Sequence, residues 1–219
     1  MKLKRHISVT QNDDWSCALC AVRIIFRFLK KRGITNQQLV NDLKNLDLPI
    51  STAGIFISEV GALSLIRGQK CKLNYPKNIL PEISFPYFNN KLTLPKQGIK
   101  LNHIHGHLRK GFYRSLFTYL GLGGQAIIFE NNKPNFRDII KALNRKSCVL
   151  VSINCREYYD IKENWLHTIA FIPSFGKSHP IDVYKKRGRF VYGSRWSKHL
   201  KHSESYDWNN WAGEMLEIY

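Results

Sequence analysis

Long apolar runs are missing from this sequence, and acidic residues are scarce. No apolar stretch approaches the roughly 18 residues that a membrane-spanning helix needs. The first residues, MKLKRHISVTQNDDW, turn polar where a secretory signal peptide needs an apolar stretch. We therefore expect a cytoplasmic protein with no transmembrane segment.

The shortage of acidic residues leaves a large positive charge. Thirty-four Lys and Arg stand against sixteen Asp and Glu, which gives a net charge of +18. The excess is spread along the chain and forms no basic tail; the last nineteen residues, with one Lys and four acids, carry −3. Such a charge favours an acidic substrate, an acidic protein partner, an anionic membrane surface or nucleic acid, and it says nothing about the fold.

Cysteine is also scarce. Five cysteines in 219 residues are too few and too scattered for a disulfide scaffold, and the odd number leaves at least one free thiol. A reducing compartment is the simplest interpretation. Disorder is excluded by the 43% hydrophobic and 12% aromatic content, which is enough for one sizeable core.

Helical patterns come first along the chain and strand patterns later. The clearest helix, SCALCAVRIIFRFLKKR, has an apolar stripe, with Ser16 as its N-cap and Gly33 as its stop. Thr35 and Gln38 read as a capping box for the second helix. The expected helices are 16–32, 35–46, 52–66 and 135–144, and the expected strands are 148–154, 167–172, 180–184, 189–194 and the closing GEMLEIY.

This order predicts an α+β fold in one domain over residues 1–219, with N-terminal helices and a C-terminal antiparallel sheet. Residues 75–125 fit the pattern least. Four prolines between 76 and 95, then loose aromatic and basic residues, predict an irregular insertion with a short helix near 108–120.

Cys17 has the surroundings of a nucleophile. It comes in the first turn of the strongest helix, where backbone N–H groups and the helix dipole lower the pKa of a thiol. Gln11, six residues earlier, carries an amide that can donate to an oxyanion. His167, at the start of the strand HTIAFI, is the candidate base, and Asp182 on the next predicted strand is placed to orient its imidazole.

These residues resemble a known family. The run Gln11-Asn-Asp-Asp-Trp-Ser-Cys17, followed by a long apolar helix, is similar to the start of the bacteriocin-leader-processing (double-glycine) peptidases of the papain superfamily. WLHTIAFI and WNNWAGEMLEIY resemble their histidine strand and last segment, and RIIFRFL resembles guanylyl-cyclase-domain-containing relatives. The resemblance covers roughly residues 1–70 and 134–219 and implies a papain-like fold.

By this resemblance, Gln11 is the oxyanion donor, Cys17 the nucleophile and His167 the base. The family's acid commonly sits in an Asp-Pro pair, which this chain lacks, and an alternative alignment of RFVYGS puts Ser194 at that position. The third member of the site is therefore Asp182 or Ser194. The family's Asp-Cys-Gly is Ser-Cys-Ala around Cys17.

Other interpretations are weaker. Cys17 and Cys20 form a CxxC, but a thioredoxin-type site needs a preceding strand in a βαβ context. The histidines 103, 105 and 107 alternate as zinc ligands can, yet no well-spaced acid or cysteine follows, which favours solvated histidines. Cations and aromatics at 184–192 are compatible with nucleic-acid binding, although the cations fall in a predicted hairpin turn.

The sequence therefore predicts a papain-like cysteine hydrolase that cleaves a peptide or amide bond through a thioester on Cys17. It needs no metal or organic cofactor, and its expected substrate is an acidic peptide or protein. Two alternatives stay open. The same site supports acyl transfer to an amine or alcohol, and a catalytically degenerate papain-like protein would bind an acidic partner or nucleic acid through its basic surface.

Overall fold

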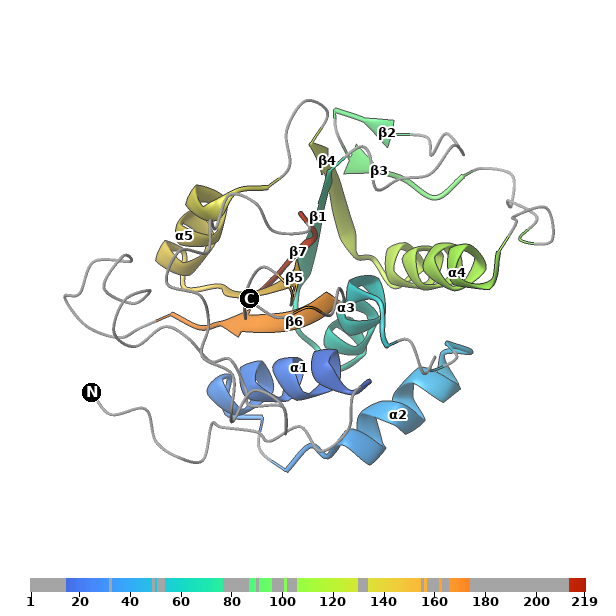
Figure 1. Ribbon diagram of the computed structural model, residues 1–219, viewed down its shortest axis with the longest axis horizontal. Coiled ribbons are helices and arrows are strands. Elements are labelled where there is room, and N and C mark those ends of the chain that lie inside the picture. The colour runs from blue at the N-terminus through green and yellow to red at the C-terminus, as the bar shows by residue number, and fades with distance from the viewer. Residues whose placement is uncertain are drawn as a thin grey trace.

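The computed structural model describes residues 15–31, 33–48, 50, 54–76, 87–89, 91–95, 101, 106–129, 134–154, 156, 162, 166–173 and 213–219. Five helices and seven strands lie in these ranges (Figure 1). In chain order they are α1 (Cys17–Phe28), α2 (Asn36–Asn45), α3 (Ile57–Ile66), β1 (Cys71–Pro76), β2 (Tyr87–Phe88), β3 (Lys91–Leu92), α4 (His107–Gly121), β4 (Gln125–Phe129), α5 (Phe136–Asn144), β5 (Cys148–Asn154), β6 (Leu166–Phe171) and β7 (Met215–Ile218).

The first two helices form where the sequence predicts them, with one change at an end. Eight of the twelve α1 residues are buried, as its apolar stripe requires. The stop expected at Gly33 is wrong: α1 ends at Phe28, because Lys30 adopts a positive φ of 63° and the Lys31 N–H returns to the Phe26 carbonyl at 2.7 Å. The predicted capping box of α2 is confirmed, since the Gln38 N–H donates to Thr35 Oγ1 at 3.2 Å.

All seven strands join one sheet, in the order β2-β3-β4-β1-β7-β5-β6. Helices together with this sheet make the α+β class. The last strand of the chain, β7, lies in the middle of the sheet, antiparallel to both β1 and β5. The last strand of the chain therefore links β1 and its neighbours β2 to β4 to the pair β5 and β6.

The expected antiparallel sheet is wrong in one respect: β1 and β4 are parallel, with Leu73 opposite Ala126. A parallel pair needs a crossover connection, and α4 lies in it. Residues 75–125, expected to be an irregular insertion, thus contribute β2, β3 and the fifteen-residue α4 to the fold. The pattern was obscured because α4 places exposed cations among its buried residues, Phe112, Tyr113, Leu116, Tyr119 and Leu120.

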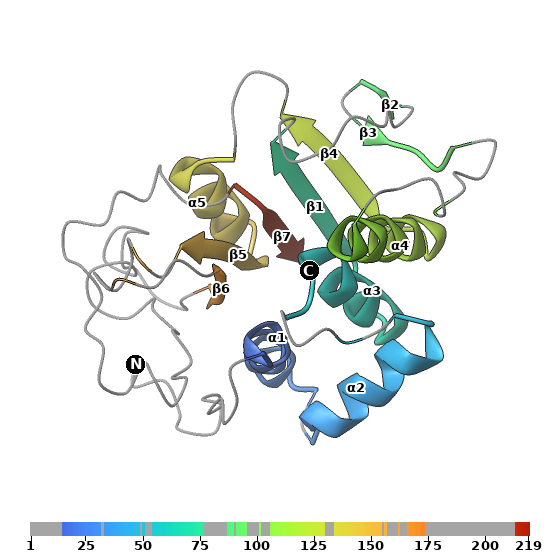
Figure 2. The same ribbon diagram turned by 45° about the vertical axis from the view of Figure 1, so that its right-hand side comes forward.

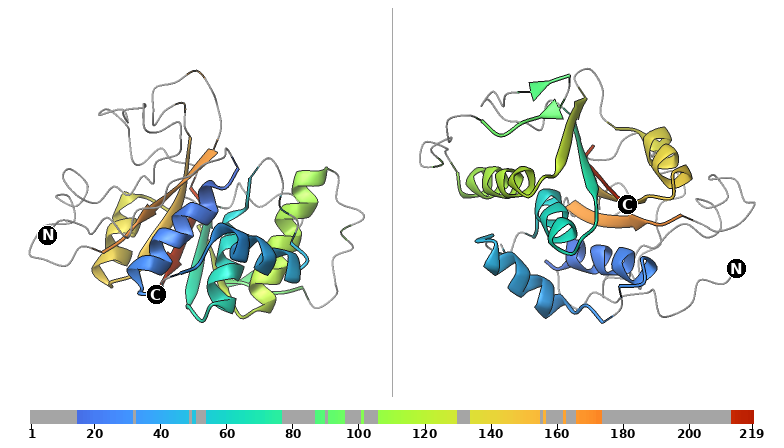
Figure 3. Two further views of the ribbon diagram at one scale, coloured as in Figure 1. Left: turned by 90° about the horizontal axis from the view of Figure 1, so that it is seen from below. Right: turned by 180° about the vertical axis from the view of Figure 1, so that it is seen from behind.

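Helices cover both faces of the sheet. Figure 2 shows β5, β6 and β7 between α5 on one side and α1 on the other, and Figure 3 shows the same layers from two further directions. One large cluster of buried residues joins α1, α2, α3 and α4 to one face of the sheet. Ala170 and Ile172 belong to this cluster, whereas Ile169 and Phe171 are buried outside it. We call these the α1 face and the α5 face.

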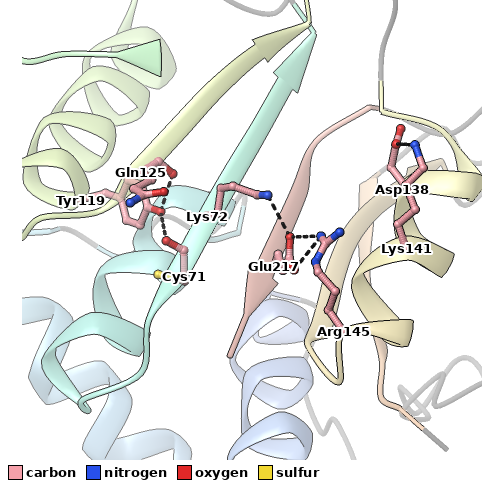
Figure 4. A network of polar contacts seen from close by, with 8 residues as sticks. All are labelled: Cys71, Lys72, Tyr119, Gln125, Asp138, Lys141, Arg145 and Glu217. Atoms are coloured by element: carbon pink, nitrogen blue, oxygen red, sulfur yellow. Dashed lines mark hydrogen bonds and ion pairs between the residues drawn. The ribbon is translucent and has the colours of Figure 1, made fainter. Parts of the chain in front are cut away.

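Tyr119 of α4 fixes the parallel pair of strands. Its hydroxyl lies 3.0 Å from the Cys71 carbonyl oxygen of β1 and 2.8 Å from the Gln125 carbonyl oxygen of β4, and donates to this pair (Figure 4). The ring lies against two glycines: a Cβ on Gly61 would come within 2.7 Å of it, and one on Gly124 within 2.3 Å. Glycine is therefore required at both positions by this close approach.

The strand predicted at 148–154 is confirmed as β5 with the same bounds, and those near 167–172 and at the C-terminus are confirmed as β6 and β7. The helices expected at 52–66 and 135–144 are found as α3 and α5. The strands expected at 180–184 and 189–194 lie outside the described residues. Within the described ranges, each helix is too short or too polar to cross a bilayer.

Candidate active site

Cys17 differs from the other cysteines that the structure describes. It is the first residue of α1 and is partly exposed, whereas Cys20, Cys71 and Cys148 are buried. Burial raises the pKa of the Cys71 thiol to about 12, and burial also raises the pKa of Cys148. Because the thiolate is the nucleophile, these two buried thiols are unsuited to nucleophilic attack at neutral pH.

The start of α1 gives Cys17 a favourable electrostatic position. Ser16 occupies the N-cap, but its side chain makes no capping hydrogen bond and instead lies 3.8 Å from the Cys20 sulfur. The first intrahelical bond runs from the Cys20 N–H to the Ser16 carbonyl at 3.0 Å. The N–H groups and dipole of this first turn stabilise negative charge on an adjacent sulfur.

Strand β6 passes directly beside this sulfur. The Cys17 thiol donates to Thr168 Oγ1 at 3.9 Å, a long contact between two residues 151 positions apart in the sequence. Successive side chains of a strand point to opposite faces, so the strand that turns Thr168 towards α1 turns His167 towards the α5 face. The pairing of β5 with β6 is regular throughout, with His167 opposite Ile153.

His167 is therefore adjacent to the Cys17 contact in sequence, but its side chain is directed to the other face of the sheet. The residue is 2% exposed, and burial lowers the pKa of the imidazole to about 4. Its ring is neutral at pH 7, which leaves it able to accept a proton but a weak base.

On the α1 face, further polar side chains continue from Thr168. Ser152 of β5 is the cross-strand partner of Thr168, and its hydroxyl donates to Glu214 Oε2 at 3.2 Å. Glu214 immediately precedes β7, two residues before Leu216 of the α1-face cluster. We call Cys17, Thr168, Ser152 and Glu214 the polar row. It crosses a face that is otherwise lined with apolar residues.

Two carboxyl groups near this row titrate close to neutral pH. Burial raises the pKa of Glu214 to about 7, although the hydrogen bond from Ser152 lowers it. Burial likewise raises the pKa of Glu59 to about 7; this side chain accepts the Phe56 N–H at 2.8 Å at the start of α3. Tyr75 of β1 is close enough to both for their charges to raise its own pKa, after the larger effect of burial.

The α5 face holds a carboxylate of the opposite kind. Glu217, 3% exposed, accepts hydrogen bonds from Arg145 at 2.9 and 3.0 Å and pairs with Lys72 at 3.2 Å (Figure 4). Burial alone would raise its pKa, but hydrogen bonds from Ser147 and Arg145 and the charge of Lys72 lower it below its ordinary value. This cluster links β1, β7 and the end of α5 through ion pairs, and we expect it to stabilise the fold.

Several predicted site residues cannot be placed against this geometry. Gln11, Asp182 and Ser194 lie outside the described residues, as do His103 and His105. His107 is described and is an exposed residue at the start of α4. Over the described ranges, no three His, Cys, Asp or Glu side chains gather as metal ligands would.

Sequence reasoning missed Thr168, Ser152 and Glu214. A signal was present for Ser152, because it is a polar residue inside the apolar run CVLVSIN, where strand alternation points it into a core. Thr168 directly follows the predicted base His167, and threonine is common in strands, so nothing marked it as the residue that contacts Cys17. Nothing in the sequence indicates that Glu214 reaches Ser152.

Comparison of the chain with protein-family models, curated proteins and solved structures finds no match. The resemblance to the bacteriocin-leader-processing peptidases therefore stays a prediction. The structure defines a coarser class: an α+β protein with a partly exposed thiol at a helix start, packed against a sheet.

Proposed function

We propose that this chain is a papain-like cysteine hydrolase that cleaves a peptide or amide bond through Cys17. The observation that carries the proposal is the position of Cys17: it begins α1, is partly exposed and contacts β6, while the other described cysteines are buried. The Cys17 sulfur attacks the carbonyl carbon and forms a thioester. The amine leaves with a proton, and water then hydrolyses the thioester.

In the proposed mechanism, His167 is the base that the family resemblance implies, and Gln11 and the Cys17 backbone N–H hold the oxyanion. Asp182 or Ser194 orients the imidazole. For His167 to act on the thiol, its side chain must reach the α1 side of β6, since strand alternation directs it to the other face. The net charge of +18 favours an acidic peptide or protein as substrate.

Thiol labelling tests the proposal. The protein is treated with a limiting amount of an alkyne-tagged iodoacetamide at pH 7.5, and labelling of each cysteine is measured by peptide mass spectrometry. Cys17 should be labelled at least about tenfold faster than Cys20, the thiol one turn further into α1. Cys17→Ala should abolish the fast labelling and Cys20→Ala should not. Labelling of Cys20 or Cys155 with Cys17 untouched would overturn the proposal.

Product analysis separates hydrolysis from acyl transfer. Wild-type protein and the Cys17→Ala variant are incubated with a library of acidic peptides, with and without a primary amine. Free carboxylic acid as the product in both conditions indicates hydrolysis. A product that gains the mass of the amine indicates acyl transfer through the same thioester.

A second candidate is a catalytically degenerate scaffold that binds an acidic partner. Two observations favour it: His167 is directed away from Cys17, and an apolar groove of about 260 Å³ with a basic rim lies beside α4. The groove is lined by Ile50, Phe56, Leu101, His107, Leu108, Lys110, Gly111 and Arg114.

Binding measurements across salt concentrations test this candidate. An acidic peptide should bind wild-type protein more weakly as salt rises, and more weakly still after Lys110→Met, whereas Lys141→Met on α5 serves as the control. The same series with DNA and RNA tests the nucleic-acid alternative, which weak binding with a flat salt dependence would exclude.

A further inference from the structure

The two cysteines of α1 lie one helical turn apart. Cys17 is the first residue of the helix and Cys20 is the fourth. A rise of about 1.5 Å and a rotation of about 100° per residue place their Cα atoms about 5 Å apart. This separation lies within the range of about 4.4–6.8 Å that a disulfide bond spans. Cys17 is partly exposed and Cys20 is buried, so a reagent in solution reaches Cys17 first.

The first turn of a helix can adjust to such a bond. Side chains three residues apart in a helix have Cβ atoms about 5–6 Å apart, and a disulfide needs about 3.5–4.5 Å. The N–H groups of the first helical residues do not bond within the helix, so a rotation about φ of Cys17 breaks no intrahelical bond of its own N–H. A small rotation of Cys17 therefore brings the two side chains together.

Polar groups surround the buried Cys20 sulfur. Asn36 of α2 donates from Nδ2 to this sulfur at 3.6 Å, and the Ser16 hydroxyl lies 3.8 Å from it. Asn36 Oδ1 in turn accepts a hydrogen bond from Arg23 at 2.8 Å. Burial and the charge of Arg27 lower the pKa of Arg23 whereas Cys20 raises it, so the thiol and the Arg23 guanidinium are close enough to interact. Donors and a cation near a sulfur stabilise its thiolate.

Cys71, another buried cysteine, has the opposite surroundings. Its thiol donates to the Gly61 carbonyl oxygen at 3.5 Å, and an acceptor of this kind favours the neutral thiol. The Cys20 sulfur instead accepts a hydrogen bond from Asn36. The surroundings of Cys20 therefore suit a thiol that becomes a nucleophile towards its neighbour in the helix.

We infer that Cys17 and Cys20 form a reversible disulfide when the protein meets a low-molecular-weight disulfide, and that this bond switches off the Cys17 nucleophile. The inference rests on the proposed function, in which Cys17 is the reactive thiol. It gives the CxxC spacing a role in regulating that site, with Cys20 as the resolving thiol.

Two exchange steps form the bond. The Cys17 thiolate attacks one sulfur of the small disulfide, whose S–S bond breaks, and one small thiolate leaves with the bonding electron pair. The Cys20 thiolate then attacks the Cys17 sulfur, and the second small thiolate leaves. Two cysteine thiols are oxidised to one disulfide, the small disulfide is reduced to two thiols by the same two electrons, and these thiols take up the two cysteine protons. An excess of a small thiol reverses both steps.

The experiment uses dithiobis(nitrobenzoate), an anionic aromatic disulfide whose released thiolate is measured by its absorbance. The protein carries Cys155→Ser, because Cys155 lies outside the described residues and its thiol would add to the count. At pH 7.5 we expect two equivalents of thiolate. The second should appear at a rate that does not depend on reagent concentration, because Cys20 attacks within the same chain. Cys20→Ala should release one equivalent, and Cys148→Ala, which also removes a buried cysteine, should release two.

Peptide mass spectrometry identifies the bond. Trypsin cleavage after Arg5 and Arg23 places both cysteines in the peptide 6–23, which should lose two hydrogens on oxidation and carry no thionitrobenzoate. The oxidised protein should no longer be labelled at Cys17 by iodoacetamide, and excess dithiothreitol should restore the labelling.

Asn36→Asp tests the surroundings of Cys20 while both cysteines are kept. It places a negative charge beside the sulfur, so the second phase should slow by about threefold for each unit by which the thiol pKa rises, since higher nucleophilicity partly offsets the loss of thiolate. Asn41→Asp adds the same charge at an exposed position of α2 and should keep the original rate. Circular dichroism of each variant separates a changed rate from a changed fold.

Three results would overturn the inference: release of one equivalent by the protein with both cysteines, a second phase whose rate rises with reagent concentration, or equal second phases in Asn36→Asp and Asn41→Asp. Failure of the proposed function looks different, because the first phase would then be as slow as in Cys17→Ala. That result would remove the inference together with the function on which it rests.

Discussion

Two glutamates three residues apart in the last strand region behave as opposites. Glu214 lies on the α1 face with a hydroxyl as its hydrogen-bond donor, and its pKa is raised to about 7. Glu217 lies on the α5 face with Arg145 and Lys72, and its pKa is lowered. Both are removed from water to a large extent, so the difference comes from the partners that each face provides.

The comparison separates a carboxylate that is held in its charged form from a carboxyl group that titrates near neutral pH. Cations hold Glu217 in its charged form, which makes it a fixed anchor between β1, β7 and α5. Glu214 has only partial compensation from Ser152 and therefore changes its protonation state near neutral pH. The same residue type thus has opposite pKa shifts on the two faces of the sheet, because each face provides different partners.

The largest expected effect comes from removing the charge of Glu217. Glu217→Gln should lower the free energy of unfolding at pH 7 by about 2 kcal/mol, because the charge-assisted hydrogen bonds from Arg145 are lost in a buried site. Arg145 is about half exposed, so water screens its attraction to Glu217 and limits the loss. Urea unfolding monitored by circular dichroism measures the change.

The matched control for Glu217→Gln is Lys141→Met, which removes the exposed ion pair between Lys141 and Asp138 (Figure 4). Both residues lie on α5, the helix that Arg145 follows. Its cost should be only a few tenths of a kcal/mol. Equal losses in Glu217→Gln and Lys141→Met would contradict the description of Glu217 as a buried anchor.

The opposite sign is expected for the carboxyl groups near the polar row. A pKa raised from 4.5 to about 7 gives stability that is complete below about pH 4.5 and is lost as pH rises towards 7. Glu214→Gln and Glu59→Gln should therefore each stabilise the protein at pH 8, on the order of 1 kcal/mol relative to their effect at pH 4. Thermal unfolding at the two pH values measures this, and a uniform loss at both would argue against it.

His167 should limit stability in the acid range. Its pKa is lowered from 6.5 to about 4, so its contribution is complete above about pH 6.5 and is lost as pH falls towards 4. His167→Gln should flatten the loss of stability over this window, by about 1 kcal/mol. Melting temperatures at pH 7 and pH 4.5 test it; an acid limb as steep as that of the wild type would show that the imidazole does not titrate there.

Much of the fold could be predicted from local patterns. The apolar stripe of α1, the Thr35–Gln38 capping box and the run CVLVSIN are each determined by neighbouring residues, so the sequence sufficed. The parallel pairing of β1 with β4 depends on a crossover through α4, and the central place of β7 depends on contacts between distant segments. Such pairings leave little trace in one sequence.

The candidate site divides in the same way. Cys17 could be found because a helix start has a local signature. The side of β6 that meets Cys17 could not, because a shift of one residue exchanges His167 with Thr168, and both fit the strand pattern. Ser152 and Glu214 meet across 62 residues of sequence, a contact that no local rule predicts.

An effect of similar size should come from a polar contact without charge. Tyr119→Phe removes the hydroxyl that donates to the Cys71 and Gln125 carbonyl oxygens and leaves the ring against Gly61 and Gly124. We expect a loss of about 1 kcal/mol, because two buried carbonyl groups lose their shared donor. Unlike the loss in Glu217→Gln, it should be independent of salt between 0.05 and 1 M NaCl, since no charge is removed and screening acts on charges. Urea unfolding at the two salt concentrations distinguishes the variants. A strong salt dependence in Tyr119→Phe would mean that the hydroxyl stabilises the parallel strands through the charged groups of the α5 face, and the division between the two faces would fail.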